Sequence, residues 1–216
     1  MNKVIIYLIL SDVLILSAFG LIAPIFAIFL DQGISGGSIA AAGLASAIFL
    51  LTKSVVQLPL SLYLDKKKGK MTFLIVGTLL IVIVPIFYAI SPNINFIFWA
   101  QGIYGLGAAM AYPAWYSLFT MHLDRKHRGF EYSLWATSVG IATAITAFLG
   151  ARGVEMLGFR NLFYIVSGIG FVGLVILISL TGKFLKDIRK TERAFVNKFK
   201  CLWCFPHAHT KPHLKK

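Results

Sequence analysis

The chain has 216 residues, of which 58% are hydrophobic and only 13% are charged, and its formal net charge is +13. So few polar side chains cannot cover a water-soluble globule, and the composition therefore predicts a membrane protein. The positive charge would also suit nucleic acid, but nucleic-acid binding needs basic residues on one soluble face, whereas here they collect where the anionic lipids of the inner leaflet would lie.

Six apolar segments are long enough to cross a bilayer, because a helix needs about 20 apolar residues to span the hydrocarbon core. Each segment is apolar on all sides, which suits contact with lipid and with neighbouring helices. We therefore expect an all-α membrane protein whose transmembrane helices cover approximately residues 4–30, 38–64, 71–90, 95–121, 132–151 and 159–181.

Asp12 in the first segment and Lys53 in the second are charged residues inside predicted spans. An unpaired charge at the middle of a membrane helix costs about 2.5 to 3.5 kcal/mol, so an ion pair between them is expected. Gln57 follows Lys53 by one helical turn on the same face. These three residues predict a polar patch in a cavity, on the pathway of a substrate or a proton. Two alternatives stay open: a purely structural ion pair, or an Asp12 that lies at the membrane interface.

The segment DKKKGK, residues 65–70, separates the second and third spans. It is short enough for a tight turn, and Gly69 can take the positive φ that such a turn needs. Of the 21 Lys and Arg residues, 18 lie in segments 1–3, 65–70, 122–131 and 182–216, which all fall on one side of the membrane. The excess of basic residues on that side predicts an inner-membrane protein with both termini in the cytoplasm.

Two stretches carry a family resemblance. Asp65 and Lys66, followed by Gly69 and Lys70, match a motif between the second and third helices, with Ser61 where a glycine is usual. Residues 102–134 contain a glycine-rich fourth helix, a proline near its inner end and a basic loop with an Arg-Gly pair. Over residues 4–181 the chain thus resembles the amino-terminal six-helix half of a major facilitator superfamily transporter. A Gly-Pro-x-x-x-Gly-Gly motif of the fifth helix and the second six helices are not found.

The resemblance implies half of a twelve-helix fold that carries a small solute by alternating access, without ATP, enzymatic activity or a cofactor. A coupling proton or ion is a further expected partner, and the two halves would come from a homodimer or from a separate second chain. Ion pairs of an inner gate are implied for Asp65, Arg128 and Glu131, beside the loop motif of Asp65, Lys66, Gly69 and Lys70. The alternative for the gate residues is that they only set the topology of the chain. The alternatives for the protein as a whole are a membrane scaffold or regulatory module, and a fragment without activity of its own.

Aromatic and small residues of the fourth and fifth spans are expected to serve packing. Trp99, Tyr104, Tyr112, Trp115 and Trp135 are interpreted as interfacial anchors or packing residues rather than as the lining of a substrate path. Small residues spaced by four predict close helix contacts through Gly105 and Gly107 in the fourth span and through Ala136, Gly140 and Ala144 in the fifth.

Residues 182–216 form a basic tail in which apolar residues recur at helical spacing. This pattern predicts an amphipathic helix on the inner leaflet, in contact with membrane lipids, followed by a disordered end. Weak candidates for a metal site are Cys201, Cys204, His207, His209 and His213. Their spacing is much tighter than that of a zinc finger, so we expect no bound metal. Acylation of a cysteine is another possibility.

Overall fold

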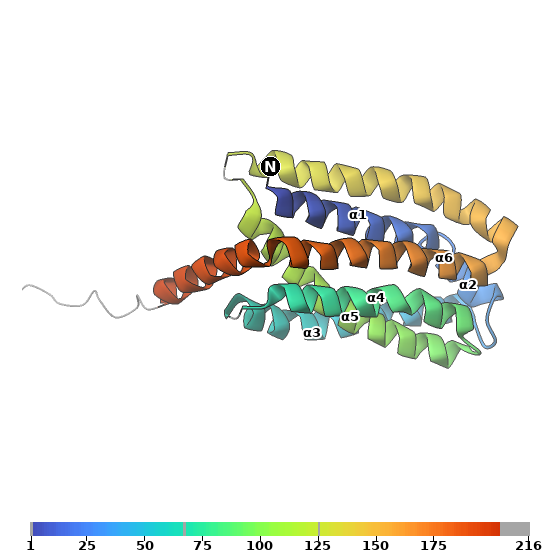
Figure 1. The fold of residues 1–216 in the computed structure, drawn as a ribbon. Helices are drawn as coiled ribbons and strands as arrows, with labels where there is room; N and C mark the ends of the chain where they lie inside the picture. Colours follow the sequence, from blue (N-terminus) through green and yellow to red (C-terminus); the bar gives the residue numbers. More distant parts are fainter. Residues whose placement is uncertain (1, 67, 125, 204–216) are drawn as a thin grey trace, which may run out of the picture.

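The computed structural model describes residues 2–66, 68–124 and 126–203, and every regular element within these ranges is a helix. The elements are α1 (Lys3–Ile22), α2 (Phe26–Gln32), α3 (Ile39–Lys66), α4 (Lys70–Ile90), α5 (Ile94–His122) and α6 (Arg128–Trp203) (Figure 1). Five helical segments are long and apolar enough to cross a membrane: Lys3–Gln32, which joins α1 and α2, then α3, α4, α5, and Arg128–Gly182 of α6. The predicted all-α membrane fold is therefore confirmed.

The first crossing consists of α1 and α2, with a short break that contains Pro24. A proline lacks the backbone N–H that would continue the helical ladder, and its ring clashes with the preceding turn. Pro59, Pro85 and Pro113 lie inside α3, α4 and α5 without ending them.

The long helix α6 is two helices joined at Gly158, where the backbone takes φ 77° and ψ 165°. A positive φ of this kind is accessible to glycine at little cost. Figure 1 shows that the chain doubles back at this point, so that residues 128–157 and 159–203 form two arms that run in opposite directions. With the arms counted separately, the described chain makes six helical crossings.

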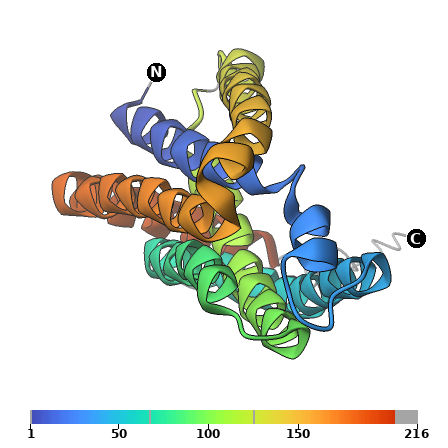
Figure 2. The ribbon, with the colours of Figure 1, turned by 90° about the vertical axis from the view of Figure 1, so that its right-hand side faces the viewer.

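The six crossings pack as two groups of three. One group contains α3, α4 and α5, and in the other α1 lies between the two arms of α6 (Figure 2). The groups meet where α4 packs on the second arm of α6, and there the buried Ser167 hydroxyl donates a hydrogen bond of 2.7 Å to the Val82 carbonyl oxygen.

Close helix contacts in the first group depend on glycine. A Cβ atom at Gly107 of α5 would lie 2.9 Å from the Gly77 carbonyl oxygen of α4, and one at Gly105 would lie 2.8 Å from the Phe49 carbonyl oxygen of α3. The predicted contacts of the fourth span are therefore confirmed. The same prediction is wrong for the fifth span within this chain, because a Cβ atom at Gly140 would meet no described atom within 4 Å.

Two elements keep a wide apolar face uncovered. Along α3 the exposed residues include Leu44, Leu51, Val55 and Leu58, and along the first arm of α6 they include Ile141 and Phe148. A soluble monomer rarely exposes such continuous apolar surface. These faces therefore suit lipid or a second membrane domain.

The second arm of α6 continues beyond its membrane-spanning part to Trp203. Ile188 and Val196 of this extension are buried within the chain itself, and the Phe184 ring lies 5.9 Å from the ring of Tyr7 in α1. The apolar stripe that the sequence assigns to the membrane surface thus packs partly on the end of the bundle. Residues 204–216 lie outside the described ranges.

Candidate functional site

The carboxylate of Asp12 lies in the middle of α1 and has an aromatic partner. Its Oδ2 accepts a hydrogen bond of 2.7 Å from the indole Nε1–H of Trp135, on the first arm of α6. The two residues are 123 positions apart and meet because α1 packs along that arm. A hydrogen bond to a charged acceptor is stronger than one between neutral groups, so Trp135 holds the carboxylate in place.

The ammonium group of Lys53 in α3 lies over aromatic ring faces. Its Nζ is 4.2 Å from the centroid of the Tyr112 ring and 6.0 Å from that of Phe49. The negative face of an aromatic ring attracts a cation, and this attraction grows when water is absent. Lys53 is half-buried, so ring faces replace part of its hydration.

Asp12 and Lys53 do not form the ion pair that the sequence predicts. Among the described residues, Asp12 instead accepts a hydrogen bond from Trp135, and Lys53 lies over aromatic rings. The reason is the helix order in space: α1 packs mainly on α6 and α3 mainly on α5. Tyr112 of α5 lies under Lys53 and also lines a cavity with Asp12, so it is a neighbour of both charged residues.

A small cavity of about 30 Å³ lies beside Asp12, which is room for roughly one water molecule. Polar groups in its lining come from Ser11, Asp12, Thr78, Tyr104, Tyr112 and Trp115. The indole N–H of Trp115 is buried and has no hydrogen-bond partner among the described atoms. The cavity thus contains an acceptor and an unused donor, the arrangement that a small polar solute or a proton carrier requires.

A larger groove of about 250 Å³ adjoins this cavity and shares Phe19 and Tyr104 with it. The Tyr104 ring stacks on Phe49 at 4.3 Å and on Phe19 at 5.3 Å. Gln101 also lines the groove; it is buried, and its Oε1 has no hydrogen-bond partner in the described chain. An aromatic surface with one free acceptor suits an apolar, partly aromatic molecule.

The sequence interpretation of the aromatic residues, as anchors or packing residues, does not single out those that lie at the cavity. Tyr104, Tyr112, Trp115 and Trp135 all lie in or beside the cavity, whereas Trp99, with 78% of its surface exposed, fits the expected outer position. A usable signal was position along the helix. Interfacial anchors sit near helix ends, but Tyr104 and Tyr112 lie well inside the Ile94–His122 helix.

Gln57 lies outside this cluster. It is half-buried one turn after Lys53, and it does not line the cavity or the groove described above.

The loop motif folds around a carboxylate from far along the chain. Gly69 has φ 98°, which confirms the expected left-handed turn. Glu192 Oε2 accepts the N–H of Gly69 at 3.1 Å, and its Oε1 accepts the N–H of Lys70 at 3.0 Å. The buried Lys70 ammonium donates to the Leu64 carbonyl oxygen. The start of α4 is therefore capped by the extension of α6.

The residues of the predicted inner gate, Asp65, Arg128 and Glu131, do not pair with one another in the described structure. Glu131 is buried, and its Oε2 accepts the N–H of Asp124 at 3.0 Å, so it ties down the loop before α6. Arg128 is exposed, and neither it nor Asp65 forms an ion pair with a described residue. In the same loop the backbone N–H of Lys126, and then the His127 ring, lower the pKa of the Asp124 carboxyl. Lys66, the last residue of α3, is exposed.

The metal candidates of the tail lie at and beyond the end of the described residues. The backbone of Cys201 belongs to the end of α6. The other four candidates, Cys204, His207, His209 and His213, lie outside the described residues.

Comparison with known proteins gives one consistent family. Residues 8–212 match the Major Facilitator Superfamily. The chain is 32% identical to the methylenomycin A resistance protein of Bacillus subtilis over 108 residues, which is 50% of this chain and 23% of that relative. It is 24% identical to the quinolone resistance protein NorA of Staphylococcus aureus over 185 residues, 83% of this chain and 45% of that relative. The chain therefore aligns with less than half of either relative.

Proposed function

Because the chain belongs to the Major Facilitator Superfamily, a family of membrane transporters and not of enzymes, we propose that it takes part in secondary transport of a small solute by alternating access. One observation carries this proposal. Asp12 and Lys53 are opposite charges inside membrane-spanning segments, and Asp12 lines a cavity together with Tyr112, whose ring lies under the Lys53 ammonium. Ionisable groups in such segments are costly and commonly mark a transport pathway.

The separation of the two charges supports a binding role. A direct ion pair would neutralise both groups, whereas here the carboxylate uses one oxygen for Trp135 and the ammonium lies over ring faces. A solute that carries both a positive and a negative charge could bind to such a site. The Asp12 carboxylate could also take up a proton. Gln57, one turn from Lys53, would extend this path toward the loop motif.

The neighbouring groove favours an aromatic or apolar solute, because Phe19, Phe49 and Tyr104 form its stacked wall. Two relatives are named as resistance proteins for methylenomycin A and for quinolones. These compounds are therefore the first solutes to test.

The complete transporter would need a second six-helix half. In this fold two halves are related by an axis along the membrane normal. The uncovered faces of α3 and of the first arm of α6, which carries the open stripe of Ala136, Gly140 and Ala144, are suited to meet it. We propose a second copy of this chain as that half, with a separately encoded half as the alternative.

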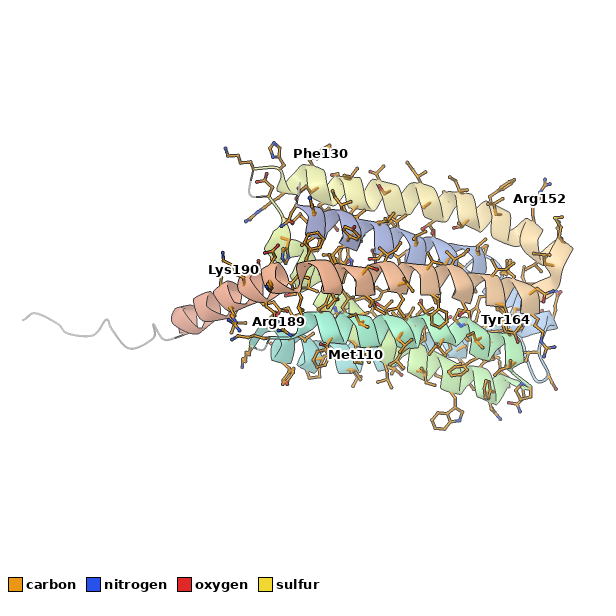
Figure 3. All side chains as sticks on the ribbon, viewed as in Figure 1. Met110, Phe130, Arg152, Tyr164, Arg189 and Lys190 are labelled. Carbon is orange, nitrogen blue, oxygen red and sulfur yellow. The ribbon has the colours of Figure 1, made fainter. Side chains whose placement is uncertain are left out.

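The proposed orientation places both termini in the cytoplasm. In Figure 3, Arg189 and Lys190 lie at one end of the bundle and Arg152 lies at the other. The distribution of 18 of the 21 basic residues favours the first of these ends as the inner one. Asp65 and Arg128 would then lie on the inner side, free to pair with the second half when the inner gate closes.

Flux through proteoliposomes tests the proposal. The purified full chain is reconstituted with an imposed pH gradient, and uptake of a fluorescent quinolone and of methylenomycin A is measured. Asp12→Asn and Lys53→Met are expected to reduce the flux at least tenfold. Glu155→Gln, which removes an exposed charge near the bend of α6, is the matched control and should keep it.

Two results would contradict parts of the proposal. Flux that survives both substitutions would remove Asp12 and Lys53 from the pathway. The lack of flux for every solute, together with stable binding to another membrane complex, would favour a scaffold or regulatory module.

A further inference from the structure

A second, basic pocket lies where α6 leaves its membrane-spanning part. It has a volume of about 320 Å³ and lies between the start of α4 and the second arm of α6. Its polar lining includes Lys68, Arg189 and Arg193 together with the hydroxyl groups of Thr72 and Thr181. The pocket is large enough to admit a phosphate group with its substituents.

The three basic side chains of this pocket lack partners in the described chain. None of Lys68, Arg189 and Arg193 forms an ion pair or a hydrogen bond through its side chain to a described residue. The carboxylate beside them belongs to Glu192, which is 2% exposed and accepts two backbone N–H groups with its two oxygens. The pocket therefore has an uncompensated positive charge.

The basic pocket also has apolar lining residues. Met71 and Ile75 contribute from α4, and Leu185 and Ile188 contribute from α6. Met71 and Ile75 belong to a membrane-spanning segment, so the apolar part of the lining leads from the basic residues toward the hydrocarbon core. A ligand that matches both parts has an anionic head and an acyl chain.

We propose that the basic pocket binds an anionic phospholipid of the adjacent leaflet. Lys68, Arg189 and Arg193 would contact the phosphate group, and one acyl chain would lie along Ile75 and Leu185. Basic pockets between membrane helices recognise anionic head groups because a compact phosphate can meet several cations at once. This site is separate from the cavity beside Asp12 and does not depend on the transported solute.

Lipid binding to the purified full chain tests this site. Native mass spectrometry with dioleoyl phosphatidylglycerol and dioleoyl phosphatidylcholine compares an anionic with a zwitterionic head group on the same acyl chains. The double variant Arg189→Gln, Arg193→Gln is expected to bind phosphatidylglycerol roughly tenfold more weakly. The matched control is Lys186→Gln, Lys190→Gln, which removes the same charge from the same helix outside the pocket. Figure 3 shows Arg189 on the side of this helix that faces α4 and Lys190 on the other side.

Lys68→Gln is a second variant, because it lies in the loop before α4 and does not alter α6. Weaker phosphatidylglycerol binding in this variant and in the arginine pair, but not in the lysine control, supports the site. Equal loss in both double variants would mean a diffuse attraction to the basic helix and would overturn it. So would equal binding of the two lipids, or full displacement of phosphatidylglycerol by millimolar inorganic phosphate, which would show that the acyl chain contributes nothing.

Discussion

Replacement of Glu192 by alanine should loosen the extension of α6 from the start of α4. The carboxylate accepts two backbone hydrogen bonds, of 3.1 and 3.0 Å, from Gly69 and Lys70, and the side chain is 2% exposed. Hydrogen bonds to a charged group contribute about 1.5 to 3 kcal/mol each. Gly69 is half-buried, so its N–H can bond to water when the carboxylate is removed, which favours the lower end of this range. The lower value for each bond gives a loss of about 3 kcal/mol in the free energy of unfolding.

Equilibrium unfolding of the full chain in mixed detergent micelles measures this loss. Glu192→Gln keeps the shape of the side chain and one acceptor oxygen, and should lose roughly half as much stability. Asp187→Ala removes an exposed acid from the same helix and should change the stability by less than about 0.5 kcal/mol. Equal stability of the Glu192→Ala and Asp187→Ala variants would refute the reasoning, because the cap would then contribute nothing.

Three further predictions concern the bundle. Gly107→Val should destabilise the protein by about 1 to 3 kcal/mol in thermal unfolding, because the new valine side chain would meet the α4 backbone. Gly102→Val on the same helix has open space around it and should leave the stability unchanged. Trp135→Phe removes the donor to Asp12 while keeping a ring, and a double-mutant cycle with Asp12→Asn should give a coupling of at least about 1 kcal/mol; additivity would disprove the interaction. Gly140→Leu, on the open face of α6, should leave thermal stability unchanged but abolish chemical cross-linking between copies; persistent cross-linking would place the dimer interface elsewhere.

The sequence was sufficient for the fold class because bilayer thickness sets the length of an apolar helix. It also anticipated the left-handed Gly69, since a tight turn between two long spans needs such a residue. Helix packing was harder to predict. Asp12 and Lys53 lie on consecutive spans, but the order of spans along the chain does not determine which helices touch, and here α1 packs mainly on α6 and α3 mainly on α5.

The cap on α4 could not be predicted from the neighbouring sequence, because the residue that provides it lies 122 positions away from Lys70. Glu192 is one of two acidic residues, with Asp187, in a strongly basic tail, and nothing near it in the sequence points to Lys70. The composition of the tail favours a role at the lipid surface and so predicts that its apolar residues face the membrane. The structure instead uses Ile188 and Val196 to dock the same helix on the protein.

The distance along the chain between Lys70 and Glu192, 122 residues, has a consequence for biogenesis. Domains synthesised from the amino terminus acquire their contacts in the order in which segments emerge. The first turn of α4 is therefore made before its cap exists, with its amide groups in water at the membrane surface, and it is completed only after the sixth crossing has been made. A nascent chain arrested before Glu192 would present an unfinished, hydrated helix end at the membrane surface, a natural place for a chaperone or a protease to recognise an incomplete product.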